Sequence, residues 1–208
     1  MEDKNYLEDL KDIKNLMNQS TKFLSLSGLS GVLAGIYCLV GAAFAYQLIY
    51  VGTASGIDDY KKLIITPTII FQLIAIATTV IFLSLFTGIY LSNRKANKNN
   101  QKVWNASSKR LLINFMIPLA TGGFFILFLI EKEILVLVAP LTLIFYGLAC
   151  VNASKYTLGD IRYLGVTMIV IGLVSTWFLG FGLLFWALGF GICHIVYGAM
   201  MYFKYDRK

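Results

Sequence analysis

Six long apolar runs divide this sequence, and they limit its fold more than any other feature. A helix of about 20 apolar residues crosses the hydrocarbon core of a bilayer. The 208 residues are 58% hydrophobic and 14% charged, whereas a soluble domain is nearer half apolar and a quarter charged. We therefore predict an all-α membrane protein and exclude a soluble enzyme, a secreted disulfide scaffold or a nucleic-acid-binding domain as its main body. The six predicted transmembrane helices are roughly Phe23–Val51, Leu63–Leu91, Leu111–Ile130, Ile134–Val151, Leu164–Trp177 and Phe181–Phe203.

The basic residues alternate with these runs and predict the orientation. Of the 18 Lys and Arg residues, 15 lie before the first run, between the second and third, between the fourth and fifth, or after the sixth. The other three are Lys61, Lys62 and Lys132. Basic loops stay in the cytoplasm, so both termini are predicted to be cytoplasmic. The net charge of +7 is thereby assigned to the membrane surface, and no nucleic-acid partner is expected.

The predicted spans follow one another as three hairpins. Each hairpin opens beside a basic residue, at Lys22, at Lys109–Arg110 and at Arg162. Each closes on an aromatic residue and a glycine, namely Phe86/Gly88, Tyr146/Gly147 and Tyr197/Gly198. This pattern is either a faint threefold repeat or the ordinary abundance of aromatic residues and glycine in membrane helices, and we favour the second interpretation.

Residues 1–22 precede the six-helix transmembrane domain, which we place at residues 23–208. Within Asn5–Gln19 the apolar residues recur every three or four positions, which predicts an amphipathic helix. Its polar face is mixed in sign rather than rich in lysine, unlike a typical sensor of anionic lipids. We expect this helix to lie on the cytoplasmic surface, and contact with a partner is the alternative. Its apolar face comprises Tyr6, Leu7, Leu10, Ile13, Leu16 and Met17.

The apolar runs contain hardly any group that could carry chemistry. Ionisable residues at depth are costly and mark functional sites, and His194 is the one that the six runs contain. A single histidine cannot form an HExxH zinc site or a bis-histidine haem site. Cys38, Cys150 and Cys193 lie far apart in apolar segments, as small buried residues do. The sequence therefore predicts no enzyme activity, no cofactor and no metal site.

His194 lies ten residues before Lys204, which places it about 15 Å deep at 1.5 Å per residue. We expect it to be neutral, because burial disfavours the charged ring, and to bond a hydroxyl group of another helix. This structural role is favoured over a proton-sensitive or ligand-binding role. Four residues at similar depth are candidate partners: Tyr37, Thr78, Thr79 and Tyr146.

Small residues form ridges on the first and sixth predicted helices. Spacing of the GxxxG type lets helix backbones approach closely, either within one bundle or between two chains, and we favour packing within the bundle. The prolines Pro67, Pro118 and Pro140 are predicted to kink the second, third and fourth helices. The predicted helix-packing residues are Ser27, Gly31, Gly35, Gly191 and Gly198.

Two stretches carry a resemblance to a known family. They are Lys22–Gly31 (KFLSLSGLSG) and the region from Asn152–Tyr156 (NASKY) through Phe185–Gly198 (FWALGFGICHIVYG). Over most of its length the chain resembles a family of uncharacterised small six-span integral membrane proteins of Bacteroidota. The resemblance implies a bacterial inner (cytoplasmic) membrane and no particular activity.

Two functions are compatible with these features. The first is a non-catalytic scaffold or accessory subunit that works through helix–helix contacts and its cytoplasmic face, with the lipid bilayer and a membrane protein or a second copy as partners. The second is a small transporter or channel for an apolar or weakly polar substrate, with His194 at its midplane. We favour the first, because a pathway for polar solutes needs polar lining groups.

Overall fold

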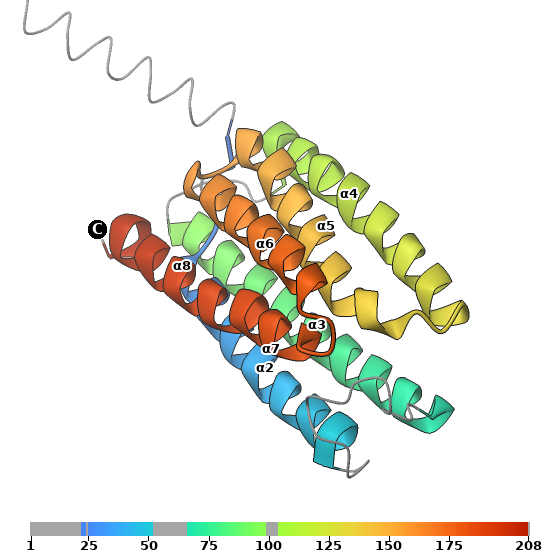
Figure 1. Cartoon of the computed structure of the whole chain (residues 1–208). Helices are drawn as coiled ribbons and strands as arrows, with labels where there is room; N and C mark the ends of the chain where they lie inside the picture. Colours follow the sequence, from blue (N-terminus) through green and yellow to red (C-terminus); the bar gives the residue numbers. More distant parts are fainter. Residues whose placement is uncertain (1–21, 24, 52–65, 99–103, 208) are drawn as a thin grey trace, which may run out of the picture.

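The computed structural model describes residues 22–23, 25–51, 66–98 and 104–207. Over these ranges the chain is helical and contains no strand, and six of its helices are long and apolar enough to cross a membrane. The all-α prediction with six apolar helices is confirmed. The predicted amphipathic helix within Asn5–Gln19 lies outside the described residues. Figure 1 shows the helices as one bundle with closely similar axis directions.

Several of the six are assembled from shorter segments. The first is α2 (Gly28–Tyr46), continued by the π-helical turn η1 (Gln47–Val51). The second and third are α3 (Pro67–Lys98) and α4 (Ala106–Glu131). The fourth joins the 3-10 turn η3 (Leu135–Leu137), α5 (Val138–Ala153) and the 3-10 turn η4 (Ser154–Tyr156). The fifth is α6 (Asp160–Trp177). The sixth joins α7 (Gly182–Trp186), π-helical η5 (Ala187–Cys193), α8 (His194–Met201) and π-helical η6 (Tyr202–Asp206).

The ends of these helices differ from the predicted runs. The first helix begins at Gly28 and not at Phe23, because the backbone of Phe23 is bonded elsewhere. Its carbonyl oxygen, which a helix starting there would need as an acceptor, accepts from the Thr157 hydroxyl group at 2.7 Å, and its N–H donates to the carbonyl oxygen of Tyr156 at 2.7 Å. Helix α3 continues to Lys98, well past Leu91. The prediction that three prolines kink or open their helices is wrong at Pro67, which is the first residue of α3, where a missing N–H costs nothing. Pro118 lies inside α4, and Pro140 is the third residue of α5, directly after the 3-10 turn that begins the fourth helix.

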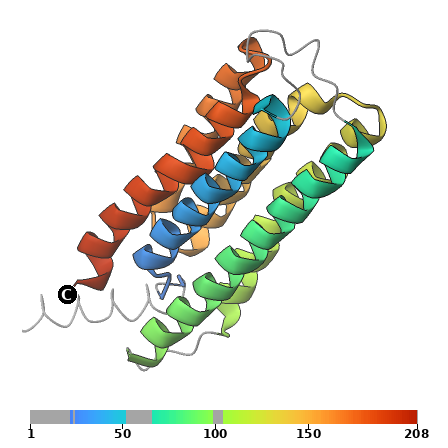
Figure 2. The same cartoon turned by 90° about the horizontal axis from the view of Figure 1, so that it is seen from below.

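Helices α2 and α5 each lie between two others. Figure 2 shows α2 between α8 and α3. Helix α5 packs along α4 on one side and along α6 on the other, and it also contacts α7. The hydrophobic core lies where α5, α6 and the sixth helix meet, around the buried side chains of Leu143, Leu164 and Met168. Helices α3 and α4 therefore occupy the two ends of the packing order.

Glycines permit the closest helix contacts. A Cβ atom added to Gly198 would lie 2.5 Å from the backbone nitrogen of Val32, and one added to Gly35 would lie 2.6 Å from the carbonyl oxygen of Gly191. Gly31 faces the Cα atom of Gly198. The predicted packing glycines thus lie together between α2 and the sixth helix. A second contact of this kind joins α5 and α6, since Gly147 and Gly165 each face the other's carbonyl oxygen.

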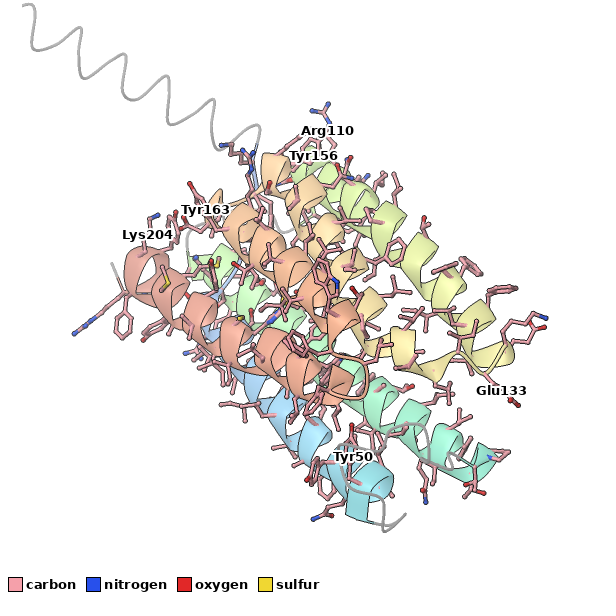
Figure 3. The ribbon with its side chains drawn as sticks, viewed as in Figure 1. Tyr50, Arg110, Glu133, Tyr156, Tyr163 and Lys204 are labelled. Carbon is pink, nitrogen blue, oxygen red and sulfur yellow. The ribbon has the colours of Figure 1, made fainter. Side chains whose placement is uncertain are left out.

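The tight link between α6 and α7 is tied to the first helix. Gly180 has a φ of 97°, a conformation that residues with a side chain rarely adopt. The hydroxyl group of Tyr50 donates to the Gly180 carbonyl oxygen at 2.7 Å. This bond fixes the link against the end of the first helix. Tyr50 and Glu133 lie at one end of the bundle and Arg110, Tyr156, Tyr163 and Lys204 at the other (Figure 3).

Candidate functional site

His194 is a buried polar residue at the junction of two helix types. It follows the π-helical segment η5 and begins α8, and its side chain is 8% exposed. The Nδ1 atom lies 3.1 Å from the carbonyl oxygen of Gly189, five residues earlier. Short π-helical segments interrupt the regular bonding of an α-helix and occur often at functional sites. Here the segment places a backbone carbonyl within reach of the imidazole ring.

The second ring nitrogen of His194 contacts α5. Its Nε2 atom lies 2.8 Å from the hydroxyl oxygen of Tyr146. The Gly189 carbonyl can only accept a hydrogen bond, so Nδ1 must carry a proton. In the neutral ring Nε2 is then an acceptor, and the Tyr146 hydroxyl group donates to it. Both nitrogens are therefore bonded within the protein, and the ring joins the sixth helix to the fourth.

Aromatic side chains surround this pair. The ring of Phe190 stacks on His194 with centroids 5.8 Å apart, and it lies 5.0 Å from the ring of Tyr146. Phe115 of α4 meets Tyr146 edge-on at 5.9 Å, and Trp186 lies 5.0 Å from Phe190. These rings fix the orientation of the imidazole and the phenol. We name His194, Tyr146, Phe190, Phe115 and Trp186 the midplane cluster.

Of the four candidate partners of His194, Tyr146 is the one that contacts it. Thr78 and Thr79 are exposed on α3, and their hydroxyl groups donate to Ile74 and Ala75 of the same helix, each at 2.8 Å. Tyr37 is half-buried, and its hydroxyl group has no partner among the described residues. The depth of all four follows from the sequence, but the face that each presents depends on helix rotation. Thr78 and Thr79 are excluded as partners because α3 packs on α2 and not on α8.

The sequence did not point to a second polar site, which centres on Asp206. Its Oδ2 atom accepts from the backbone N–H of Gly28 at 2.9 Å and from the Ser27 hydroxyl group at 3.1 Å. Its Oδ1 atom lies 2.6 Å from the Nζ atom of Lys95, which also donates to the Leu26 carbonyl oxygen at 2.8 Å. A carboxylate at a helix N-terminus is stabilised by the helix dipole and by free N–H groups. We name Asp206, Lys95, Ser27, Gly28 and Leu26 the terminal clamp.

The clamp changes the role assigned to Ser27. This residue was expected to pack helices, but it precedes α2 as the N-cap and bonds Asp206. The side chains of Lys95 and Asp206 are only 15% and 10% exposed. The clamp thus joins the start of α2, the end of α3 and the end of the sixth helix. Lys95 and Asp206 are 111 residues apart, so no local pattern could have predicted the pair.

A weaker contact lies on the other side of η6. Asp160, in the first turn of α6, accepts from the Nζ atom of Lys204 at 2.9 Å and from the hydroxyl group of Tyr205 at 2.9 Å. Lys204 is exposed, and exposed ion pairs contribute little to stability. Acidic residues are enriched near helix starts, so the position of Asp160 four residues before the predicted start at Leu164 could have drawn attention to it.

Among the described residues the cysteines and the acids form no metal-binding group with His194, although the Cys150 thiol shares a hydrogen bond with Tyr146. Within the ranges that the structure describes, no three His, Cys, Asp or Glu side chains are placed to hold a metal ion. Cys38 and Cys150 are buried thiols and Cys193 is half-buried. The midplane cluster can therefore hold a hydrogen bond in a fixed geometry, or respond to a small polar molecule that competes for it.

Comparisons with known protein families, curated proteins and solved structures identified no similar protein. Membership of the Bacteroidota family stays a prediction.

Proposed function

We propose that this protein is a non-catalytic scaffold or accessory subunit of a bacterial inner membrane. In this proposal its six helices span the membrane as three hairpins with both termini in the cytoplasm. It acts through contacts of its helices, and of its cytoplasmic face with the amino-terminal amphipathic helix, with another membrane protein or a second copy.

The observation that carries this proposal is the exposure of α3. Among the residues of α3 only Val80, Ser92 and Ala96 are buried, and apart from the ion pair of Lys95 with Asp206 the helix has substantial contact only with α2. The side chains of Phe71 and Phe82 are 73% and 67% exposed. Helix α6, by contrast, buries 28% of its 18 residues. Lipid alone can cover such a helix, but a helix held on one side is also available to a partner, whose close packing adds van der Waals contacts.

The state of His194 favours a structural role over transport. Both ring nitrogens are bonded to protein groups, and the ring is enclosed by aromatic side chains. Glycine contacts between α2 and the sixth helix bring the backbones so close that relative sliding would meet the facing main chain. Paired polar groups and close backbone contacts at the centre of the bundle support a protein with one fixed conformation.

A photo-crosslinking experiment in native membranes tests the scaffold. A photoreactive amino acid is placed at Phe82 on α3 and, as a matched control, at Val170, which is 53% exposed on α6. We expect a product of one defined mass from position 82, formed with a protein that co-purifies at fixed stoichiometry, and none from position 170. Products with lipid alone at both positions would contradict the proposal.

Cysteine labelling tests the proposed orientation separately. In a background without Cys38, Cys150 and Cys193, single cysteines replace Lys98 and Glu133, which lie at opposite ends of the bundle. Only the cysteine at position 133 is expected to react with an impermeant thiol reagent in intact spheroplasts. The reverse pattern would invert the orientation.

Transport of a small apolar or weakly polar substrate is the alternative, and the midplane cluster is the observation that favours it. A buried imidazole and phenol within an aromatic enclosure resemble the few polar groups of a ligand pocket. The variant His194→Gln retains a donor and an acceptor. If it were fully folded yet inactive in cells, or if a small molecule co-purified with the bundle and was lost in this variant, transport would replace the scaffold.

A further inference from the structure

Helices α3 and α4 follow one another in the chain but hardly touch. Each has one principal neighbour, which is α2 for α3 and α5 for α4. Exposed apolar side chains lie along both helices and reach the end of α3 and the start of α4, which the chain connects. On α3 these are Phe86, Ile89 and Tyr90, which are 61%, 68% and 59% exposed, and on α4 they include Ile113, which is 61% exposed. No other segment in the described ranges covers them.

The same ends of α3 and α4 carry basic residues without acidic partners. Arg94 and Lys98 are exposed near the end of α3, and Lys109 and Arg110 are exposed near the start of α4. Neither helix contains an acid before Glu131 at the far end of α4. Among the described residues of this region only Lys95 has a carboxylate partner, Asp206. The local charge is therefore strongly positive next to an apolar surface.

Trp104 lies beside these charges, at the start of α4. It is 64% exposed, and the Nζ atom of Lys109 lies 5.7 Å from its ring centroid. Tryptophan is enriched at the level of lipid head groups, so its position marks where the membrane interface meets this end of the bundle. Figure 3 shows Arg110 at the same end, pointing away from the helices.

We propose that one anionic phospholipid binds between the ends of α3 and α4 that the chain connects. Its head group contacts Arg94, Lys98 and Arg110, and its acyl chains cover the exposed side chains that follow along both helices. One leaflet is about 15 Å deep, which corresponds to about ten helical residues. That length reaches from Arg94 to Ser84 on α3 and from Arg110 to Ala120 on α4.

The chemistry favours an anionic lipid over a helix or a zwitterionic lipid. A protein helix would have to supply several carboxylates near the membrane interface, whereas an anionic phospholipid brings a negative charge at that level with apolar chains below it. A zwitterionic head group has no net charge to pair with three basic side chains. The lipid occupies one leaflet only, so the site does not depend on the scaffold role and leaves the outer half of α3 free.

Fluorescence quenching of Trp104 tests the proposal. In the variant Trp177→Phe/Trp186→Phe, Trp104 is the remaining tryptophan. The protein is reconstituted in vesicles of one fixed mixture of phosphatidylglycerol and phosphatidylcholine, in which either one lipid or the other is brominated. Surface charge is then identical in both samples. We expect brominated phosphatidylglycerol to quench beyond its share of the mixture, with a relative affinity on the order of tenfold, because each basic residue near the surface attracts anionic lipid.

Two matched triple variants locate the site. Arg94→Gln/Lys98→Gln/Arg110→Gln removes the proposed head-group contacts, while Lys155→Gln/Arg162→Gln/Arg207→Gln removes the same charge from exposed residues at the same end. Lys109 is kept because it touches the reporter ring. We expect the first variant to lower the preference to about onefold and the second to preserve it.

Three outcomes would overturn the proposal. They are quenching in proportion to lipid content in the parent protein, an equal loss of preference in both triple variants, and protection of Trp104 from both brominated lipids. The first requires no variant at the head-group site, so a triple variant that fails to fold still leaves the proposal open to contradiction. Circular dichroism and a single elution peak serve as the check of folding.

Discussion

The midplane cluster and the terminal clamp join helices by polar contacts of opposite kinds. The midplane contact is a single bond between neutral side chains, Tyr146 and His194, enclosed by aromatic rings. The terminal clamp is charged, and Asp206 accepts from an ammonium group, a hydroxyl group and a backbone N–H. A charged group is strongly destabilised at the centre of a membrane, whereas near the helix ends it can reach the membrane interface. Depth in the membrane therefore decides which polar contact a helix bundle can use.

The two contacts should also differ in strength. Hydrogen bonds between membrane helices average about 0.6 kcal/mol and reach at most about 2 kcal/mol. Hydrogen bonds to charged groups contribute about 1.5–3 kcal/mol. Removing one partner of a buried ion pair costs more, because the other charge is left unpaired. We therefore expect the clamp to stabilise the bundle more than the midplane contact.

The largest effect is expected where both contacts are disrupted together. Gly198 lies between His194 and Asp206 on the sixth helix, and its added Cβ atom would meet the backbone of α2. Gly198→Leu should lower the free energy of unfolding by about 3 kcal/mol or more, measured by denaturant unfolding in detergent micelles. Gly88→Leu is the control, since nothing lies within 4 Å of its added Cβ atom. Equal loss in both variants would show that the close contact is not what matters.

Removing the clamp should have the next largest effect. Asp206→Ala leaves Lys95 without its carboxylate and the start of α2 without its acceptor, so we expect a loss of about 2–3 kcal/mol. Asp160→Ala should cost less than about 1 kcal/mol, because its partner Lys204 is exposed. Thermal unfolding at low and high salt compares the two. A greater cost for Asp160→Ala would reverse our ranking of the two ion pairs.

The midplane contact should contribute less than the clamp. His194→Leu and Tyr146→Phe are each expected to cost about 1 kcal/mol, and the double variant should cost less than their sum, because both remove one hydrogen bond. His194→Gln, which retains a donor and an acceptor, should be tolerated. A double-mutant cycle in unfolding experiments measures the coupling. Simple additivity would mean that the bond between the two rings contributes nothing.

The smallest effect is expected at the hydroxyl groups that share the depth of His194 but not its contacts. Thr78→Val should change stability by less than about 0.5 kcal/mol, because Thr78 is exposed and bonds its own helix. The same unfolding assay checks this variant beside Tyr146→Phe. A cost similar to that of Tyr146→Phe would show that α3 contributes to the midplane cluster after all.

The sequence is sufficient to predict properties that depend on the residues of one segment. Apolar content over some 20 residues sets whether a helix can span a bilayer, so the six helices followed from composition. The isolation of His194 among apolar residues, and the glycines of the first and sixth helices, were also visible in the chain. Each of these is a property of one segment, independent of its neighbours.

Which segments meet depends on the three-dimensional packing of the helices. Tyr146 was one of four hydroxyl groups at a suitable depth, and helix rotation and packing order select among them. The start of α2 at Gly28 depends on Asp206 and Thr157, both distant in sequence. The exposure of α3 is likewise a matter of packing, since α3 is as apolar as the helices that are covered. Membrane helices lack a hydrophobic driving force to associate, so close glycine contacts and a few polar groups fix their arrangement. The hydropathy of the sequence therefore does not predict which helices pack together.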